Sequence, residues 1–369
     1  MSQDASPQPP TAGERLIALD QFRGYTVLGM FVVNFLGAFA ATPELLRHTN
    51  RYCGYADTIM PHFFFAVGFA FQLTWQRRVE RDGLAAARRH TLRRNLLLLG
   101  IGILLYGFDR PAKSWDAWQE LGLIEGLLKA TTGSTFQTLV HIAVTALWIL
   151  PLIGRSRRLR ALALVASAAL HVTLSQLFYF DWTQSHRTID GGVLGFVSWA
   201  IPMLAGTLAC DAVTQHGPTI ARGRLWLGGL VLMAAGYALS CVGPMLAGGD
   251  PLLAAPPFVP AWHPLDLWTM SQKTGAASYQ LFGAGLSLLL FALTLELCER
   301  RGWSLGVFRT LGQNALAGYV LHIFTGRLLG ALLPKDAPGL AVGVLLGLYL
   351  LLTIAIMRAL ERRGLYWKL

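Results

Sequence analysis

Ten long stretches of this 369-residue chain contain no Asp, Glu, Lys or Arg. A helix that crosses the apolar core of a bilayer, about 30 Å thick, needs roughly 20 apolar residues. The stretches therefore predict about ten membrane spans, the shortest of them extended back to about Thr91 so that Arg93 and Arg94 reach the interface. They cover residues 24–43, 58–76, 95–108, 130–154, 161–180, 191–210, 225–249, 274–295, 310–326 and 337–357.

The composition agrees with a membrane protein. Charged residues make up 14% of the chain, compared with about 25% in an ordinary soluble domain. The net charge of +11 lies in short loops between apolar runs, so we expect a lipid bilayer and no nucleic acid as partner. The cysteines and histidines have no metal-binding spacing, so we expect no metal. The fold class predicted is all-α: a single transmembrane helix bundle over residues 15–369, preceded by a disordered cytoplasmic tail at 1–14.

The positions of Lys and Arg predict the orientation. With the N-terminus in the cytoplasm, 22 of the 31 Lys and Arg residues fall on the cytoplasmic side, as the positive-inside rule describes. We therefore expect both termini inside, and the loops near 43–56, 109–129, 179–190, 248–273 and 334–336 outside. Short loops favour a multi-pass protein of a bacterial inner (plasma) membrane. In the outer segment 114–129, Trp115, Trp118, Leu121 and Leu128 are spaced for an interfacial helix, and a packed loop is the alternative.

Polar residues in or beside membrane spans are costly and are candidates for function. Asp20 and Arg23 lie at the inner mouth of the first span, where a spacing of three lets them pair on one helix face. They form either a structural pair or a site at which Arg23 meets an anionic cytosolic ligand. Asn34 lies deep in the same span, and it needs a hydrogen-bond partner there, on a neighbouring helix or on a substrate.

His48 and Asp57 flank the outer end of the second span. A histidine with a carboxylate partner is the usual arrangement of a general base, because the carboxylate fixes the tautomer and raises the basicity. The alternative for His48 is a solvated surface histidine. The alternative for Asp57 is an acid at the start of a helix, where the positive end of the helix dipole favours it. His62, His141 and His171 lie inside spans, and we interpret them as packing residues.

A polar stripe runs through the ninth predicted span, LGQNALAGYVLHIF. It contains Asn314, Tyr319 and His322, whose spacing brings them to neighbouring positions on one helix. Such a stripe must face a cavity or another helix rather than lipid.

In these segments the chain resembles the heparan-α-glucosaminide N-acetyltransferase family and its bacterial relatives, which are multi-span acyltransferases. The first span carries the pattern in Leu19, Asp20, Phe22, Arg23, Gly24, Met30, Val33 and Asn34. The second part carries it in His48, Gly54, Ala56, Asp57, Pro61, Phe63, Phe64, Phe65 and Gly68. Later matches are Asp190, Gly192, Gly195, Gly312, Asn314, Tyr319 and His322. His62 departs from the pattern, since an aromatic residue is usual there.

The resemblance implies transfer of an acetyl group from cytosolic acetyl-CoA to the amine of an extracytoplasmic amino sugar or glycan. His48 matches the catalytic histidine of that family. We hypothesise that His48 deprotonates the acceptor, that Asp57 orients His48, and that Asn34, with Asn314, stabilises the oxyanion. Substrate and CoA contacts are expected from Asp20, Arg23, Asp190, Asn314, Tyr319 and His322. Arg23 and the arginines from Arg77 to Arg94 are candidates for the CoA phosphates.

Two alternatives stay open at the level of sequence. A ping-pong route through acetylated His48 is chemically sound. A transporter of a small polar or sugar-like solute also fits ten spans with buried polar residues, although its key residues should cluster near the midplane rather than at the outer face. A homodimer is compatible with either.

Overall fold

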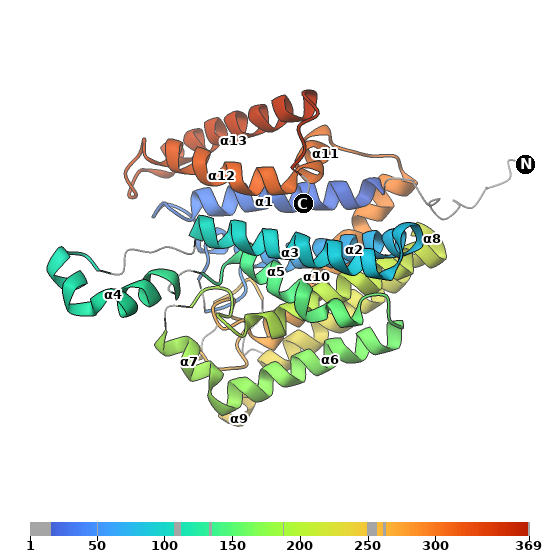
Figure 1. Cartoon of the computed structure of the whole chain (residues 1–369), viewed down its shortest axis with the longest axis horizontal. Helices are drawn as coiled ribbons and strands as arrows, with labels where there is room; N and C mark the ends of the chain where they lie inside the picture. Colours follow the sequence, from blue (N-terminus) through green and yellow to red (C-terminus); the bar gives the residue numbers. More distant parts are fainter. Residues whose placement is uncertain are drawn as a thin grey trace, which may run out of the picture.

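The computed structural model describes residues 16–49, 51–106, 112–132, 135–186, 188–248, 257–260 and 263–367, without the side chains of 127–132. The predicted tail at 1–14 lies outside these residues. Every regular element described is helical, as the composition and the apolar runs predict. The long helices lie side by side, and the chain passes repeatedly from one end of the bundle to the other (Figure 1).

The helices that build the bundle are α1 (Ile17–Leu36), α2 (Tyr55–Asp82), α3 (Leu84–Tyr106), α4 (Trp115–Thr132), α5 (Thr138–Ile149), α6 (Arg157–Leu174), α7 (Phe180–Ser185), α8 (Gly195–Ser240), α9 (Val242–Leu246), α10 (Ala277–Leu295), α11 (Gly306–Gln313), α12 (Ala315–Gly330) and α13 (Gly339–Arg362). Short 3₁₀ turns cover Glu44–Leu46 and Leu150–Leu152, and π-helical turns cover Ser175–Tyr179 and Glu296–Arg300. Helices α2 and α3 extend past their apolar runs, because a helix does not have to end where its residues become charged.

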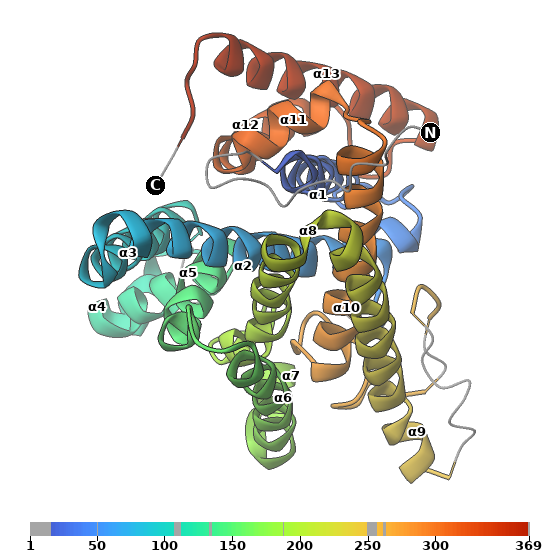
Figure 2. The same ribbon diagram turned by 90° about the vertical axis from the view of Figure 1, so that its right-hand side faces the viewer.

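Helix α8 contains two of the predicted spans. Its backbone is non-helical at Gly217, which has a φ of 74° and precedes Pro218. A proline removes a backbone donor and disfavours helical geometry in the residue before it. The two limbs of α8 therefore descend from one apex (Figure 2). Glycines on the limbs allow close packing, at Gly206 against α2 and at Gly229 and Gly236 against α10.

Four helical stretches among the described residues are long and apolar enough to cross a membrane. They are Arg157–Ser185, Gly195–Leu246, Ala277–Arg300 and Gly339–Arg362, and two shorter apolar helices cover Thr138–Leu152 and Ala315–Gly330. This count is below the ten predicted spans, partly because the two limbs of α8 count as one helix.

Helices α1 and α11 cross so closely that two positions have no room for a side chain. A Cβ on Gly24 would overlap the backbone of Phe308, and a Cβ on Gly312 would overlap the backbone of Asp20. Two glycines of the family-like pattern are therefore explained by packing. They join α1 to α11 at the end of the bundle where α1 begins.

Three local expectations are corrected. Helix α1 ends at Leu36, so Asn34 lies near the end of the helix rather than deep in a span. The ninth predicted span is broken at Asn314, whose φ of −128° and ψ of 43° separate α11 from α12, so Asn314 and His322 do not form one continuous stripe. The segment 114–129 is helical, but Gly122 has a φ of 71° and interrupts α4; the spacing of its apolar residues does not continue across the break.

Candidate active site

His48 and Asp57 form a hydrogen-bonded pair at the end of the bundle where α1 ends and α2 begins. His48 lies in the loop between these helices, and its Nδ1 is 2.8 Å from Oδ1 of Asp57. Asp57 is fully buried in the first turn of α2, where its Oδ2 accepts the backbone N–H of Gly54 at 2.9 Å. The hydroxyl of Tyr279 donates to the carbonyl oxygen of Asp57 at 2.6 Å, so α10 helps to fix the acid.

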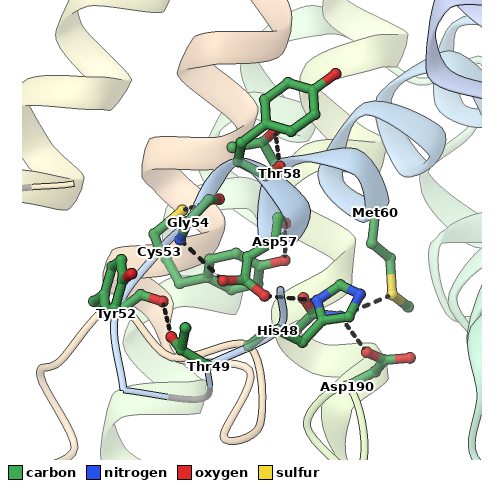
Figure 3. Close-up of polar contacts among 12 residues, drawn as sticks. His48, Thr49, Tyr52, Cys53, Gly54, Asp57, Thr58, Met60 and Asp190 are labelled. Carbon is green, nitrogen blue, oxygen red and sulfur yellow. Dashed lines mark hydrogen bonds and ion pairs between the residues drawn. The ribbon is translucent and has the colours of Figure 1, made fainter. Parts of the chain in front are cut away.

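The arrangement determines which nitrogen of His48 can act as a base. A carboxylate can only accept, so Nδ1 carries the proton and Nε2 carries the lone pair. Burial lowers the pKa of His48, but the hydrogen bond to Asp57 and the charges of Asp57 and Asp190 raise it, and the net result is a pKa above the ordinary 6.5. The His48 side chain remains 41% exposed. Figure 3 shows its ring between Asp57 and Asp190.

Asp190 is held in a tight turn just before α8. Asp190 and the next residue, Gly191, have φ values of 56° and 86°, a left-handed conformation that only glycine adopts without cost. The turn is fixed from two sides: the hydroxyl of Tyr179 donates to the Gly191 carbonyl at 2.5 Å, and the indole N–H of Trp199 donates to the Asp190 carbonyl at 2.7 Å. Burial raises the pKa of Asp190 to about 6, and the Nε2 of Gln272, 2.5 Å from Oδ1, works against that rise.

A cavity of about 430 Å³ joins these groups, and we call it the first cavity. Its polar lining comes from seven segments of the chain. Asn34, His48, Asp190, Gln272 and Tyr319 line it, with Tyr106, Gln137, Thr138 and Thr188. Apolar walls come from Met30, Val33, Ile59, Met60 and Phe63. A pocket with apolar walls and a few convergent polar groups is the usual form of a substrate site.

Asn34 is oriented by His322 on α12. The Nδ1–H of His322 donates to the carbonyl oxygen of Tyr319, which leaves its Nε2 as an acceptor. Asn34 Nδ2 lies 3.1 Å from this nitrogen and therefore donates to it. Within the described residues the Asn34 amide makes no other hydrogen bond, and Asn34 lines the first cavity. His322 itself does not line this cavity and acts on it through Asn34.

The remaining candidates lie elsewhere. Asn314 donates from Nδ2 to the Leu365 carbonyl at 2.9 Å and accepts from the Trp367 N–H at 3.0 Å, so its side chain holds the segment after α13. Asp20 is buried beside α11.

Arg23 lies near the opposite end of the bundle, where its charge and that of Arg78 act on Arg94. The 21 residues from Asp57 to Arg78 correspond to about 30 Å along α2.

Sequence reasoning missed Gln272, Tyr106 and the pair Gln137 and Thr138. Tyr106 and Gln272 lie within two residues of the end of a predicted span, and this shared level was the available signal. Gln137 and Thr138 lie well inside the span predicted at 130–154 and stand at the start of α5. His62, His141 and His171 are buried, as expected of packing residues. Within the described residues, no group of three or more His, Cys, Asp and Glu side chains is arranged to hold a metal ion.

The apolar helices and the His–Asp pair on a polar-lined cavity define an integral membrane protein with the layout of an enzyme. A family model described as an acyltransferase domain matches residues 16–359. The match covers most of the chain, which therefore belongs to this family of membrane acyltransferases. A comparison with curated proteins finds no match.

Proposed function

We propose that this acyltransferase moves an acetyl group from cytosolic acetyl-CoA to the amine of an extracytoplasmic amino sugar or glycan, in the manner of the heparan-α-glucosaminide N-acetyltransferases that it resembles. The observation that carries the proposal is the His48–Asp57 pair at the first cavity. A buried carboxylate behind a histidine is what a general base requires at neutral pH.

In the direct route, Nε2 of His48 takes a proton from the neutral acceptor amine as its nitrogen attacks the thioester carbonyl. The new C–N bond forms, the C–S bond breaks, and the CoA thiolate leaves and receives the proton from His48. Asp57 stabilises the imidazolium that exists between these steps. The second N–H of the Asn34 amide would donate to the oxyanion. Asp190 and Tyr319 provide an anion and a hydroxyl for the acceptor.

The donor would enter from the other end of the bundle. Arg23, Arg78 and Arg94 form a cationic group there, suited to the phosphates of CoA. The pantetheine arm would extend between the helices toward His48. This scheme needs both termini in the cytoplasm and about ten spans, with each limb of α8 crossing once, in an inner (plasma) membrane. Residues 15–369 would form one domain.

Sided proteoliposomes test the function. Protein of known orientation receives labelled acetyl-CoA on the cytoplasmic face and glucosamine on the other face. We expect N-acetylglucosamine only on the face opposite to acetyl-CoA. Movement of glucosamine without consumption of acetyl-CoA would instead identify a transporter. Label that stays on the protein when the acceptor is omitted would identify the ping-pong route through His48.

The variant His48→Ala tests the base. It should lose acetyl transfer by about 10²–10⁴-fold, the contribution of general-base catalysis. His186→Ala is the matched control, because His186 is exposed in the loop after α7 and does not line the cavity. Normal transfer by purified His48→Ala would disprove the mechanism.

A further inference from the structure

A second cavity of about 340 Å³ adjoins the first. It lies between the end of α1, the second half of α12 and α13. Its walls are mainly apolar and aromatic, with Phe35, Ala38, Phe39, Ile323, Leu333 and Tyr349. Gly326 and Gly330, four residues apart on one face of α12, leave room for it. The proposed acetyl transfer gives this cavity no task.

Two cations line this apolar space. Arg327 lies in the last turn of α12, and Lys335 follows in the loop before α13. Both are exposed, and within the described residues neither forms an ion pair with a carboxylate, the neighbouring Asp336 included. The apolar surface next to them is also exposed: Phe324, Leu328 and Leu332 are 58%, 64% and 65% accessible. A ligand that fits must combine an anion with an apolar chain.

The second cavity is coupled to the first. Asn34 lines both, and its hydrogen-bond partner His322 lines the second. Arg327 also lies close enough to Tyr106 for its charge to act on that phenol, and Tyr106 lines the first cavity. A molecule held at Arg327 and Lys335 therefore lies next to Asn34, and Asn34 stands between this molecule and the cavity that contains His48.

We propose that the second cavity binds the lipid phosphate of the acceptor. The acceptor would then be an amino sugar carried on a phosphate with an apolar chain. Its phosphate contacts Arg327 and Lys335, its chain lies along the aromatic walls and continues into the bilayer, and its sugar passes Asn34 toward His48. The assignment rests on the proposed function for the sugar, but the lipid phosphate site rests on the cavity and its two cations.

The competing occupant is a long acyl chain of the donor. An acyl chain explains the apolar walls, but it gives no reason for two unpaired cations in the lining. A phosphate explains both, because Arg and Lys bind phosphate through charge-assisted hydrogen bonds.

Binding to the purified full-length protein in neutral maltoside detergent tests the site. The probes are dodecyl phosphate, inorganic phosphate and dodecanol, each measured by titration calorimetry. We expect dodecyl phosphate to bind at least tenfold more tightly than dodecanol, a difference of about 1.4 kcal/mol, and inorganic phosphate to bind at least as weakly as dodecanol. Tight binding of inorganic phosphate would instead indicate a site for free phosphate and would overturn the proposal.

Two variants locate the binding. The double variant Arg327→Gln with Lys335→Gln should weaken dodecyl phosphate about tenfold or more, whereas Lys113→Gln, at another exposed lysine outside both cavities, should not. Gly330→Leu should block the probe by filling the cavity. A Cβ at Gly330 meets nothing within 4 Å, so this variant should keep its fold. Equal affinity of wild type and the double variant would disprove the assignment.

The outcomes separate this site from the proposed function. His48→Ala should bind dodecyl phosphate normally while it loses acetyl transfer, because the site holds the ligand without chemistry. If the protein transfers no acetyl group but the double variant still loses dodecyl phosphate, the proposed function fails and the lipid phosphate site remains. If Gly330→Leu instead impairs only transfer from dodecanoyl-CoA and binds dodecyl phosphate normally, the cavity belongs to the donor chain and the proposal is wrong.

Discussion

The substitution Asp57→Asn tests the geometry of the His48–Asp57 pair more sharply than removal of His48. The buried carboxylate accepts two hydrogen bonds, from His48 at 2.8 Å and from the Gly54 N–H at 2.9 Å. An asparagine has one oxygen. The Gly54 N–H needs that oxygen, because an unpaired buried donor is costly, so the asparagine NH₂ group turns toward His48. Nδ1 must then accept, and the proton moves to Nε2, the nitrogen that should act as the base.

The expected loss is in kcat. General-base catalysis contributes about 10²–10⁴-fold, equivalent to about 2.7–5.4 kcal/mol at 1.36 kcal/mol per factor of ten. The KM for acetyl-CoA should change little, because Asp57 is buried behind His48 and does not line the first cavity. The thermal stability should also change little, because the cap on Gly54 is retained.

The pH profile supplies an independent readout. Asp57 raises the pKa of His48, and catalysis needs the neutral imidazole, so the rate of the wild type should fall as the pH drops through that raised pKa. Loss of the negative charge should move this acid limb of kcat/KM to lower pH. Asp181→Asn, at an exposed acid in α7, serves as control. An Asp57→Asn enzyme with kcat within threefold of wild type and an unmoved acid limb would refute the reasoning.

Three further changes have defined outcomes. Asp190→Asn should raise the free energy of unfolding near pH 7.5 by at most about 3 kcal/mol, because a pKa raised from 3.8 to about 6 makes the ionised form unfavourable in the folded state. This advantage should disappear below about pH 4, where the carboxyl is protonated in both states. An equal advantage at both pH values would contradict the prediction. Gly24→Ala should lower stability by about 1–3 kcal/mol through its clash with α11, as measured by thermal unfolding, whereas Gly100→Ala, with open space around it, should not. His322→Phe should lower kcat about tenfold, since Asn34 loses its partner, while the acid limb of the pH profile stays in place.

The sequence predicted the class of fold because apolar runs report directly on helices that can enter a membrane. It could not predict the ends of those helices. Charged residues continue α2 to Asp82, and α3 begins at Leu84 and includes the arginines that precede the apolar run, since helix formation depends on backbone hydrogen bonds and not on hydropathy. The break at Asn314 has no local signal either, because Asn314 is held by the carbonyl of Leu365, 51 residues away.

The candidate site was predictable where its residues are neighbours in sequence. His48 and Asp57 are nine residues apart and lie on either side of one loop, so they could be paired in advance. Gln272 reaches Asp190 from 82 residues away, and neither residue indicates the other in the sequence. The two cavities are likewise products of packing between distant helices. Both cavities include residues near the end of α1 that lies beside His48.

Asp190 combines costs that a purely structural residue would avoid. Its left-handed backbone costs about 1 kcal/mol in a residue other than glycine, its buried carboxyl has a raised pKa, and the Oε1 of its partner Gln272 is buried without a hydrogen bond. An asparagine would suit the same turn, which is held through backbone contacts to Tyr179 and Trp199, and would avoid the buried charge. We therefore propose that the carboxylate serves the cavity that it lines, where it can accept a hydrogen bond from the neutral acceptor amine while His48 takes the proton. The same reasoning requires Asp190→Asn to be more stable than wild type and less active, with the loss seen mainly as a higher KM for the acceptor.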